Sequence, residues 1–155
     1  MKIEKWNAKA AEMLDQLCDN GKIRYCNRED GVLLCDEKGT FLLFVPGSHV
    51  LSVNNGKNHI SALSQYWDRY TSADSVLSDS DVSGWIDGMK CRQFCANGVT
   101  VYAQEKFLRQ FPKNTLYYVK SETDPIICGI WENDVLHVIG IVLPIRLMYR
   151  QFVKA

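Results

Sequence analysis

The sequence has no excess of either charge: 18 lysine and arginine residues balance 18 aspartate and glutamate residues, and the net charge is zero. A protein whose main task is nucleic-acid binding usually carries a strongly basic domain. The balance excludes such a domain, although a local basic face is compatible with it.

Long apolar segments are also absent. The longest apolar run, residues 138–145, is far shorter than the roughly 20 residues that a helix needs to cross a bilayer. The N-terminal segment alternates charged and apolar side chains and contains no signal-peptide core. We therefore expect a cytoplasmic protein with no membrane partner.

Closely spaced metal ligands are scarce. The three histidines are scattered, and Cys91 and Cys95 are the only close pair among six cysteines. Zinc sites use tighter pairs and a second pair of ligands. Six cysteines could form three disulfides by count alone, but in a cytosol we expect reduced thiols, no metal and no cofactor. Gly47-Ser48-His49 is typical of a loop and not of a nucleophile elbow, so we assign no catalytic residue.

What the sequence does contain is one domain's length, 155 residues, of which 46% are hydrophobic. Residues 3–19 predict an amphipathic helix, because apolar side chains recur at helical spacing. The apolar positions are Trp6, Ala10, Met13, Leu14 and Leu17. Polar turns then separate three predicted strands, over residues 22–26, 32–36 and 40–45.

The last third of the chain repeats this order. A lead-in strand over residues 99–103 precedes a short helix over residues 104–111. Three strands follow, over residues 115–120, 126–132 and 136–143. The order is again helix, strand, strand, strand.

This shared order predicts an α+β fold made of two tandem helix-plus-three-strand units. Unit one covers residues 3–46 and unit two covers residues 99–147. Both third strands end in an apolar run followed by proline, Pro46 and Pro144. The halves share little sequence identity, so the repeat is one of pattern. A mixed insertion and a basic-aromatic tail, residues 148–155, complete the chain.

The insertion, residues 47–98, has a different texture. Residues 59–70 predict a helix with one aromatic and aliphatic face. Residues 71–88 are rich in Ser, Asp and Gly and predict a loop. A strand over residues 90–95 is expected to form a hairpin with the next strand across Asn97-Gly98, a favoured two-residue turn.

Residues 79–87 match the first nine positions of an EF-hand calcium loop, with carboxylates at positions 1, 3 and 9 and glycine at position 6. Position 12, where a glutamate normally completes the ligand shell, is Lys90, whose charge repels a cation. We therefore expect an exposed acidic turn and no calcium.

The end of unit two resembles the end of the bacterial beta clamp, a DNA sliding clamp. That protein closes on an apolar strand finishing in proline, an aliphatic residue, arginine and leucine, matched here by Leu143-Pro144-Ile145-Arg146-Leu147. The spacing Val101-Tyr102-x4-Phe107-Leu108 is similar to the stretch where the final helix of the clamp begins. Asp124-Pro125-Ile126-Ile127 looks like the start of a clamp strand. The resemblance covers residues 99–147, and residues 5–46 by element order.

The resemblance implies a single DNA-clamp-like domain without catalytic activity, of the kind that phages and mobile elements carry. Bacterial clamps have three such domains per chain, whereas this chain has room for one, so a ring would need a homo-oligomer. The insertion has no clamp counterpart, and the tail extends beyond the leucine near which clamps normally end.

The resemblance also implies two binding surfaces. Leu143, Pro144, Ile145, Arg146 and Leu147 are expected to border a shallow apolar cleft for a short peptide. Its second wall is expected from residues 66–70 or from the tail residues 149–152, and the tail could instead fill the cleft.

The clamp helices line a DNA channel, where basic side chains touch phosphate without reading bases. The corresponding residues are Lys2, Lys5, Lys9, Lys106, Arg109 and Lys113. Acidic residues share the first helix, so an ordinary solvated face is the alternative.

These observations favour a non-catalytic clamp-like binding protein that acts through a protein partner or DNA. The alternative is a cytosolic α+β enzyme or small-molecule binder with a site built by residues 47–98. An enzyme should show a deep pocket that gathers perturbed ionisable groups, whereas a binding module should show a flat face or a shallow apolar cleft.

Overall fold

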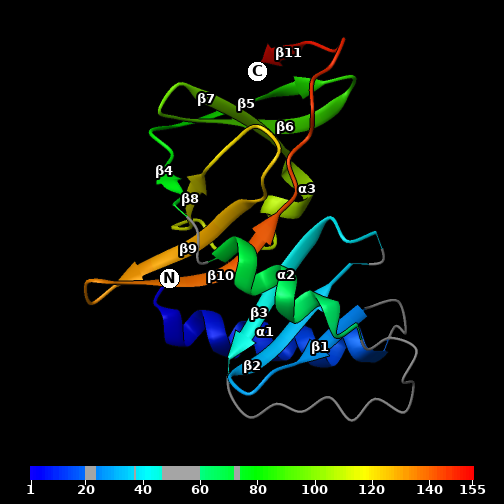
Figure 1. The fold of residues 1–155 in the computed structure, drawn as a ribbon, viewed down its shortest axis with the longest axis vertical. Helices are drawn as coiled ribbons and strands as arrows, with labels where there is room; N and C mark the ends of the chain where they lie inside the picture. Colours follow the sequence, from blue (N-terminus) through cyan, green and yellow to red (C-terminus); the bar gives the residue numbers. More distant parts are fainter. Residues whose placement is uncertain (20–23, 37, 47–59, 72–73) are drawn as a thin grey trace.

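The computed structural model describes residues 1–19, 24–36, 38–46, 60–71 and 74–155 (Figure 1), with side chains throughout these ranges except in residues 13–19. Within them the chain is α+β and mostly antiparallel. Its elements are α1 (Ile3–Asp19), β1 (Arg24–Asn27), β2 (Gly31–Cys35), β3 (Phe41–Pro46), α2 (Ala62–Thr71), β4 (Val76–Leu77), β5 (Ser80–Ile86), β6 (Met89–Ala96), β7 (Val99–Gln104), α3 (Glu105–Leu108), β8 (Leu116–Val119), β9 (Ile126–Glu132), β10 (Val135–Val142) and β11 (Phe152–Lys154).

The helices and strands predicted for both units are present as elements, with small shifts at most of their ends and a much shorter second helix. The loop Gly47-Ser48-His49 and the side chains of Met13, Leu14 and Leu17 lie outside the described residues. None of the described helices is both long and apolar enough to span a membrane.

Seven strands form one antiparallel sheet in the order β1-β2-β3-β10-β9-β8-β4. It consists of two three-stranded meanders, β1-β2-β3 and β10-β9-β8, that meet where β3 pairs with β10, and of β4, which pairs with the outer edge of β8. In that pair Leu43 lies opposite Gly140, and the Leu143 N–H extends the pairing by donating to the Thr40 carbonyl at 2.8 Å. The apolar third strands of the two units therefore form the centre of the sheet.

A second antiparallel sheet has the order β11-β5-β6-β7. The predicted hairpin between β6 and β7 is confirmed, with Asn97 and Gly98 both at positive φ, as a tight two-residue turn requires. The prediction of a loop over residues 71–88 was wrong, because β4 and β5 lie there. The polar composition favours a loop locally, but pairing with β6 along its whole length holds β5 extended.

The large sheet is covered on both faces (Figure 1). One face packs against α1, α3 and the four-stranded sheet, and Trp6, Phe94 and Leu108 are fully buried there. The other face carries α2, whose Trp67 stacks on Phe44 with ring centroids 5.4 Å apart. Every residue of β2 is buried because both of its faces are covered.

The helices and lead-in strand of the two units differ. α1 has 17 residues, whereas α3 has only four and is shorter than the helix predicted over residues 104–111. Pro112 follows closely and cannot continue a helix, and Phe111 turns inward to pack against Trp6. β7, predicted as the lead-in strand of unit two, pairs with β6 in the four-stranded sheet.

Candidate functional site

The chain after β10 lines an open cleft of about 420 Å³, which we call the C-terminal cleft. β7 and the β8–β9 turn form its other sides. The lining residues are Thr100, Tyr102, Glu122, Thr123, Ile145, Arg146, Leu147 and Met148. Three of the five residues expected to border a peptide cleft therefore line one, and the other two, Leu143 and Pro144, lie half-buried just before it.

Backbone hydrogen bonds fix the wall that follows β10. The Ile145 N–H donates to the Tyr102 carbonyl at 2.7 Å, in a single antiparallel bridge to the outer edge of β7. The Arg150 N–H donates to the Leu147 carbonyl at 2.7 Å and closes a turn in which Met148 has a φ of 50°. The wall is thus held at both of its ends.

β7 presents an unpaired stretch of backbone in this cleft. Cys95 of β6 donates its N–H to the Ser78 hydroxyl at 3.1 Å, and its carbonyl accepts from the Asp79 N–H at 2.9 Å, so both groups point away from β7. Thr100 lies directly opposite Cys95, and its own N–H and carbonyl therefore point to the outer edge of β7. Tyr102, two residues later, uses the same edge. Among the described residues nothing pairs with the backbone of Thr100 on that edge.

The side chains of the C-terminal cleft combine apolar surface with one charge of each sign. Ile145, Leu147 and Met148 supply the apolar part, while Arg146 and Glu122 are exposed. Across the described ranges neither of these two charges takes part in an ion pair. An apolar wall beside a free strand edge is the arrangement by which proteins bind extended peptides.

The expected second walls lie elsewhere. α2, which carries residues 66–70, packs over the meander β1-β2-β3 through Trp67. The tail does not fill the cleft either. Met148 joins its wall, and Phe152 in β11 lies against Tyr102 with ring centroids 5.1 Å apart.

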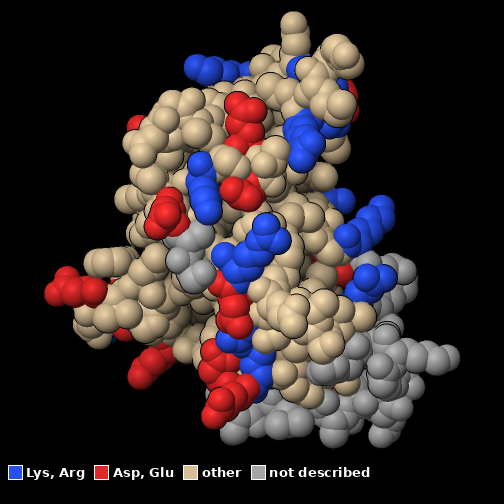
Figure 2. Space-filling model, in the orientation of Figure 1, with Lys and Arg blue, Asp and Glu red and all other residues tan. Residues whose placement is uncertain are grey.

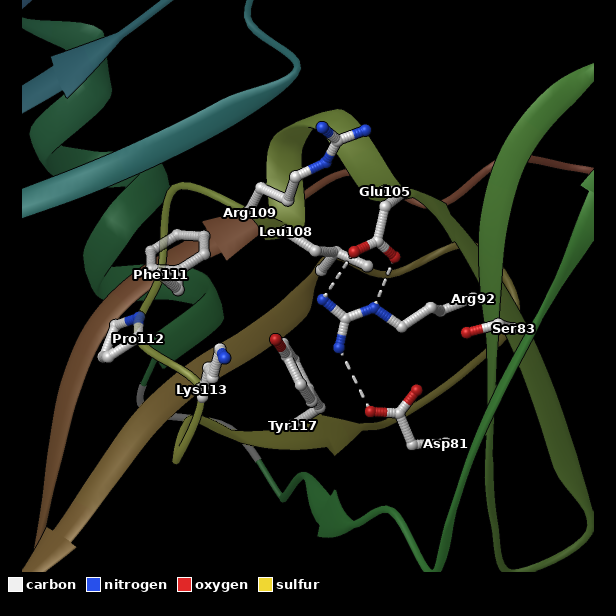
Figure 3. A pocket seen from close by; sticks show the side chains of 10 residues that line it. All are labelled: Asp81, Ser83, Arg92, Glu105, Leu108, Arg109, Phe111, Pro112, Lys113 and Tyr117. Atoms are coloured by element: carbon white, nitrogen blue, oxygen red, sulfur yellow. Dashed lines mark hydrogen bonds and ion pairs between the residues drawn. The ribbon is translucent and has the colours of Figure 1, made fainter. Parts of the chain in front are cut away.

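A second cleft, of about 490 Å³, lies between the four-stranded sheet and the α3–β8 segment, and we call it the Arg92 cleft (Figure 3). Nε and Nη2 of Arg92 donate to the two carboxylate oxygens of Glu105 at 2.7 and 3.3 Å, and Nη1 donates to Asp81 at 3.1 Å. The guanidinium lies over the Tyr117 ring, 5.5 Å from its centroid. The Arg92 and Glu105 side chains are 18% and 14% exposed, so this pair is largely removed from water.

In the Arg92 cleft the pKa values of Arg92 and Tyr117 are shifted further from neutral pH. Burial by itself would lower the pKa of Arg92, but the hydrogen bond to Glu105 and the fields of Tyr117 and Asp81 outweigh it and raise that pKa. Burial raises the pKa of Tyr117 to about 12. Neither group is suited to proton transfer near pH 7. The ion pairs of Arg92 with Glu105 and Asp81 link β6 to the start of α3 and to β5, and we call this arrangement the staple.

The residues expected to face DNA are all exposed, and the structure brings some of them together. Arg109 and Lys113 line the Arg92 cleft, while Lys106 lies outside that lining on α3. The Asn114 amide donates to the Met1 carbonyl at 2.8 Å and joins the start of α1 to this region. The remaining three residues lie at the start of the chain and along α1: Lys2, Lys5 and Lys9.

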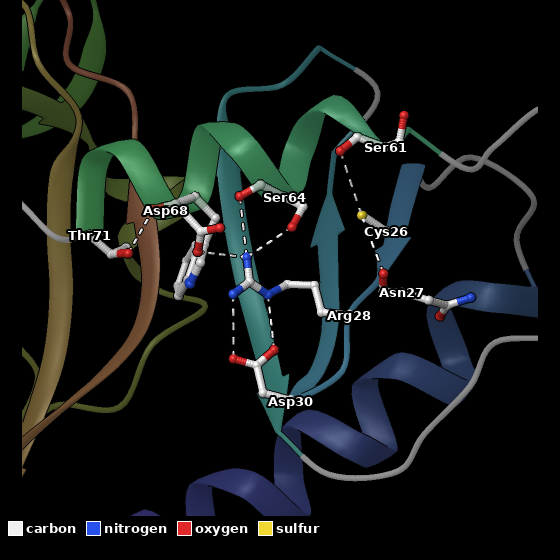
Figure 4. A network of polar contacts seen from close by, with 9 residues as sticks. Cys26, Asn27, Arg28, Asp30, Ser61, Ser64, Asp68 and Thr71 are labelled. Atoms are coloured by element: carbon white, nitrogen blue, oxygen red, sulfur yellow. Dashed lines mark hydrogen bonds and ion pairs between the residues drawn. The ribbon is translucent and has the colours of Figure 1, made fainter.

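A polar network that no sequence motif indicated joins the β1–β2 turn to α2 (Figure 4). Arg28 lies 2.9 Å from carboxylate oxygens of both Asp30 and Asp68, and it donates to the Ser64 hydroxyl at 3.0 Å. The hydrogen bond to Asp30 is the largest effect that raises the pKa of Arg28. The partners are spread along the chain and form no short motif, so only the fold brings them together.

The acidic segment 79–87 is not the exposed turn that was expected. β5 occupies most of it, and an extended strand spaces side chains of one face roughly 6.6 Å apart along its length, so their oxygens do not converge on one point as in a calcium loop. In the described part of the chain, no three His, Cys, Asp or Glu side chains are placed to hold a metal ion. The cysteines described there are free thiols.

The two clefts therefore offer different chemistry. In the Arg92 cleft the half-buried guanidinium is paired with two carboxylates, and only the exposed Arg109 and Lys113 lack an ion-pair partner among the described residues. The C-terminal cleft instead offers, within the same ranges, an unpaired strand edge beside apolar side chains, with Arg146 and Glu122 unpaired. Comparison with known proteins places neither cleft in a family, because no family model, curated protein or solved structure matches the chain.

Proposed function

We propose that this chain is a non-catalytic binding protein that holds an extended segment of a partner protein in the C-terminal cleft. The observation that carries the proposal is the free backbone edge at Thr100, directly beside the apolar wall of Ile145, Leu147 and Met148. A peptide that adds to this edge gains main-chain hydrogen bonds, while the wall selects its alternate side chains.

The charges of the cleft define the peptide further. Arg146 suits an acidic residue and Glu122 suits a basic one, and neither has to break an existing ion pair to bind. Both are exposed, so each contributes modestly to affinity, in the range of about 0.2–1 kcal/mol for a surface pair. The apolar contacts and the strand edge supply most of the binding free energy.

The clamp resemblance belongs to the same proposal. The repeated element order and the meeting of two meanders at β3 and β10 support it. The short α3 and the position of β7 in the second sheet are departures from two equal units. A clamp-like protein of this size would act through peptide motifs of its partners.

The decisive test removes the strand edge and keeps the fold. Thr100→Pro deletes an outward N–H that the β6–β7 ladder does not use, and proline is tolerated at such edge positions. Thr100→Val is the matched control, because it loses only the hydroxyl. The probes are labelled eight-residue peptides that alternate aliphatic and charged residues, together with a clamp-binding peptide and its scrambled form, all followed by fluorescence anisotropy.

We expect Thr100→Pro to weaken binding at least about tenfold, the equivalent of 1.4 kcal/mol, and Thr100→Val to bind like the wild type. Saturable binding that survives Thr100→Pro would place the peptide elsewhere. No saturable binding of any probe by the wild type would reject the proposed function.

Contact with DNA phosphates is a second candidate function. The contact between Asn114 and Met1 favours it, because it joins the chain neighbours of Lys113 and Lys2 just before α1 begins. Figure 2 shows acidic and basic side chains interspersed on the face that carries α2. The basic residues of this candidate lie on or beside α1 and α3, which pack against the other face of the large sheet.

The salt dependence of duplex binding tests this candidate. Replacing Arg109 and Lys113 by alanine should reduce the slope of log affinity against log salt by about 2, one for each lost phosphate contact. Lys38→Ala, which removes an exposed charge in the β2–β3 turn, is the control and should leave the slope unchanged. Absence of binding at about 50 mM salt would reject the candidate.

A further inference from the structure

The C-terminal segment, residues 146–155, connects the two edges of the four-stranded sheet. It starts beside the outer edge of β7, where Ile145 bridges Tyr102, and ends on the opposite edge, where β11 pairs with β5. Figure 1 shows it in red, running from β10 past this sheet to β11. The Ala155 N–H donates to the Ser83 carbonyl at 3.0 Å and ends the pairing.

Phe152 of this segment occupies a socket built for its ring. A Cβ atom on Gly84 would collide with the Phe152 ring and with the Val153 carbonyl, so the ring fits here because residue 84 has no side chain. The other side of the ring lies against Tyr102. Ile86 and Cys91 share this face of the sheet and are fully buried, although the opposite face is the one that packs on the large sheet.

The residues that hold the segment also build the C-terminal cleft. Tyr102 contacts Phe152 and lines the cleft, and Met148 lines it from the segment itself. The Arg150 guanidinium donates to the Arg146 carbonyl at 2.7 Å and lies 3.7 Å from the Asp87 carboxylate. Docking of β11 therefore fixes both an aromatic wall residue and the backbone that carries Arg146.

β11 can separate from β5 without unfolding of the domain. β11 has three residues and forms the edge of its sheet. The turn before it contains Met148 in the left-handed region, and the Tyr149 side chain is fully exposed. Elements with few buried contacts open at a small fraction of the free energy of global unfolding.

We propose that residues 148–155 form a latch that controls the C-terminal cleft. With β11 docked, Phe152 supports Tyr102 and the cleft binds its peptide; with β11 released, the cleft loses that support and one wall. The proposal rests on the peptide-binding function above and adds its regulation. Because coupling is reciprocal, a bound peptide stabilises the docked latch to the same extent.

Two substitutions release the latch by different routes. Phe152→Ala removes the ring. Gly84→Ala instead places a methyl group where the ring lies and displaces β11 without changing the sequence of residues 148–155. Val153→Ala is the matched control on the same strand, because Val153 is 59% exposed and lies on the other face. Hydrogen exchange of the Val153 and Ala155 amides, which face β5 in the antiparallel ladder, measures docking in the intact 155-residue chain. We expect both releasing variants to lose at least tenfold in protection and the control to change by less than threefold.

Peptide affinity, measured with the tightest probe that the wild type binds, gives the second readout. We expect Phe152→Ala and Gly84→Ala to raise Kd about tenfold and Val153→Ala to leave it unchanged. Saturating peptide should slow exchange in β11 of the wild type. Lost protection with an unchanged Kd overturns control of the cleft, and unchanged protection in Gly84→Ala overturns the latch itself. If the wild type binds no probe, the proposed function is overturned, and so is its regulation by the latch. The exchange data still decide whether Phe152 of β11 docks against Gly84.

Discussion

The C-terminal cleft and the Arg92 cleft are built on opposite faces of one sheet and have similar volumes, about 420 and 490 Å³. Arg92 pairs with Ala103, whereas Tyr102 belongs to the next cross-strand pair and therefore points to the other face. In the Arg92 cleft a guanidinium already has two carboxylate partners. In the C-terminal cleft a strand edge and two charges have none among the described residues.

This comparison shows that volume is a poor guide to function in this molecule. A buried donor or acceptor that is already paired stabilises the fold, and a ligand would have to replace it at a cost. An unpaired strand edge can accept a ligand with nothing to displace. The comparison therefore predicts that substitutions in the ion pairs of Arg92 change stability, and that substitutions in the C-terminal cleft change binding.

The largest effect is expected for Arg92→Met. The substitution leaves the Glu105 carboxylate, only 14% exposed, without its cation, and breaking such a pair typically costs about 3 kcal/mol. Urea denaturation should show a lower midpoint with an unchanged slope. The double variant Arg92→Met with Glu105→Leu should recover most of the loss, because no buried charge remains.

Arg109→Met is the matched control in the same cleft. Arg109 is exposed and, among the described residues, has no ion-pair partner, so its loss should change the free energy of unfolding by less than about 0.5 kcal/mol. If both substitutions lowered the free energy of unfolding equally, removal of any arginine here would destabilise the fold. The ion pairs of Arg92 would then have no particular part in stability.

Arg146→Glu probes the other side of the comparison. It should weaken binding of an acidic probe peptide about tenfold, because an attraction becomes a repulsion, and it should change stability by less than about 0.5 kcal/mol. Glu122→Lys should do the same to a basic probe. Anisotropy titrations with the acidic and basic probes measure both. A similar loss for both probes would show that Arg146 shapes the cleft instead of selecting charge.

Much of the fold could be predicted because its signals are local. β9 covers residues 126–132 as predicted, since Pro125 precedes the apolar run and Asn133-Asp134 supplies a turn with two positive φ angles after it. The helix over residues 3–19 follows from apolar spacing in the same way. Such patterns need no knowledge of what packs against them.

The features that matter for function are not local. β5 has the composition of a loop and is a strand only because β6 lies beside it. Arg92 and Glu105 are 13 residues apart, and Gly84 meets Phe152 across nearly half of the chain. The free edge at Thr100 depends on where Cys95 directs its backbone. The clamp resemblance led to Ile145, Arg146 and Leu147, but it gave no indication of the facing wall at Glu122 and Thr123.

Alkaline pH tests the burial of the Arg92 cleft with a smaller effect. The pKa of Tyr117 rises from 10 to about 12 in the folded chain, so folding favours the neutral phenol. This contribution is complete below pH 10 and is lost as the pH rises toward 12. Between pH 9 and pH 11 the wild type should lose about 1 kcal/mol more stability than Tyr117→Phe. Parallel losses would contradict the burial, and shared effects of other groups, such as Tyr66, cancel in this difference.

Asp81→Asn should have the smallest effect, and it separates the two arms of the staple. Asp81 contacts the same guanidinium as Glu105, at 3.1 Å, but its side chain is 46% exposed, so water competes for the contact. We expect a loss of about 0.5 kcal/mol at low ionic strength, falling further in about 0.5 M salt. Glu105→Gln, measured by the same urea titrations, should cost several times more and respond less to salt, because that arm is shielded from solvent. If the two variants cost the same, the guanidinium would be held equally from both sides. Asp81 would then bind Arg92 as strongly as Glu105 does, although it is more exposed. Burial would in that case not explain why the Arg92 cleft stabilises the fold while the C-terminal cleft is open to a ligand.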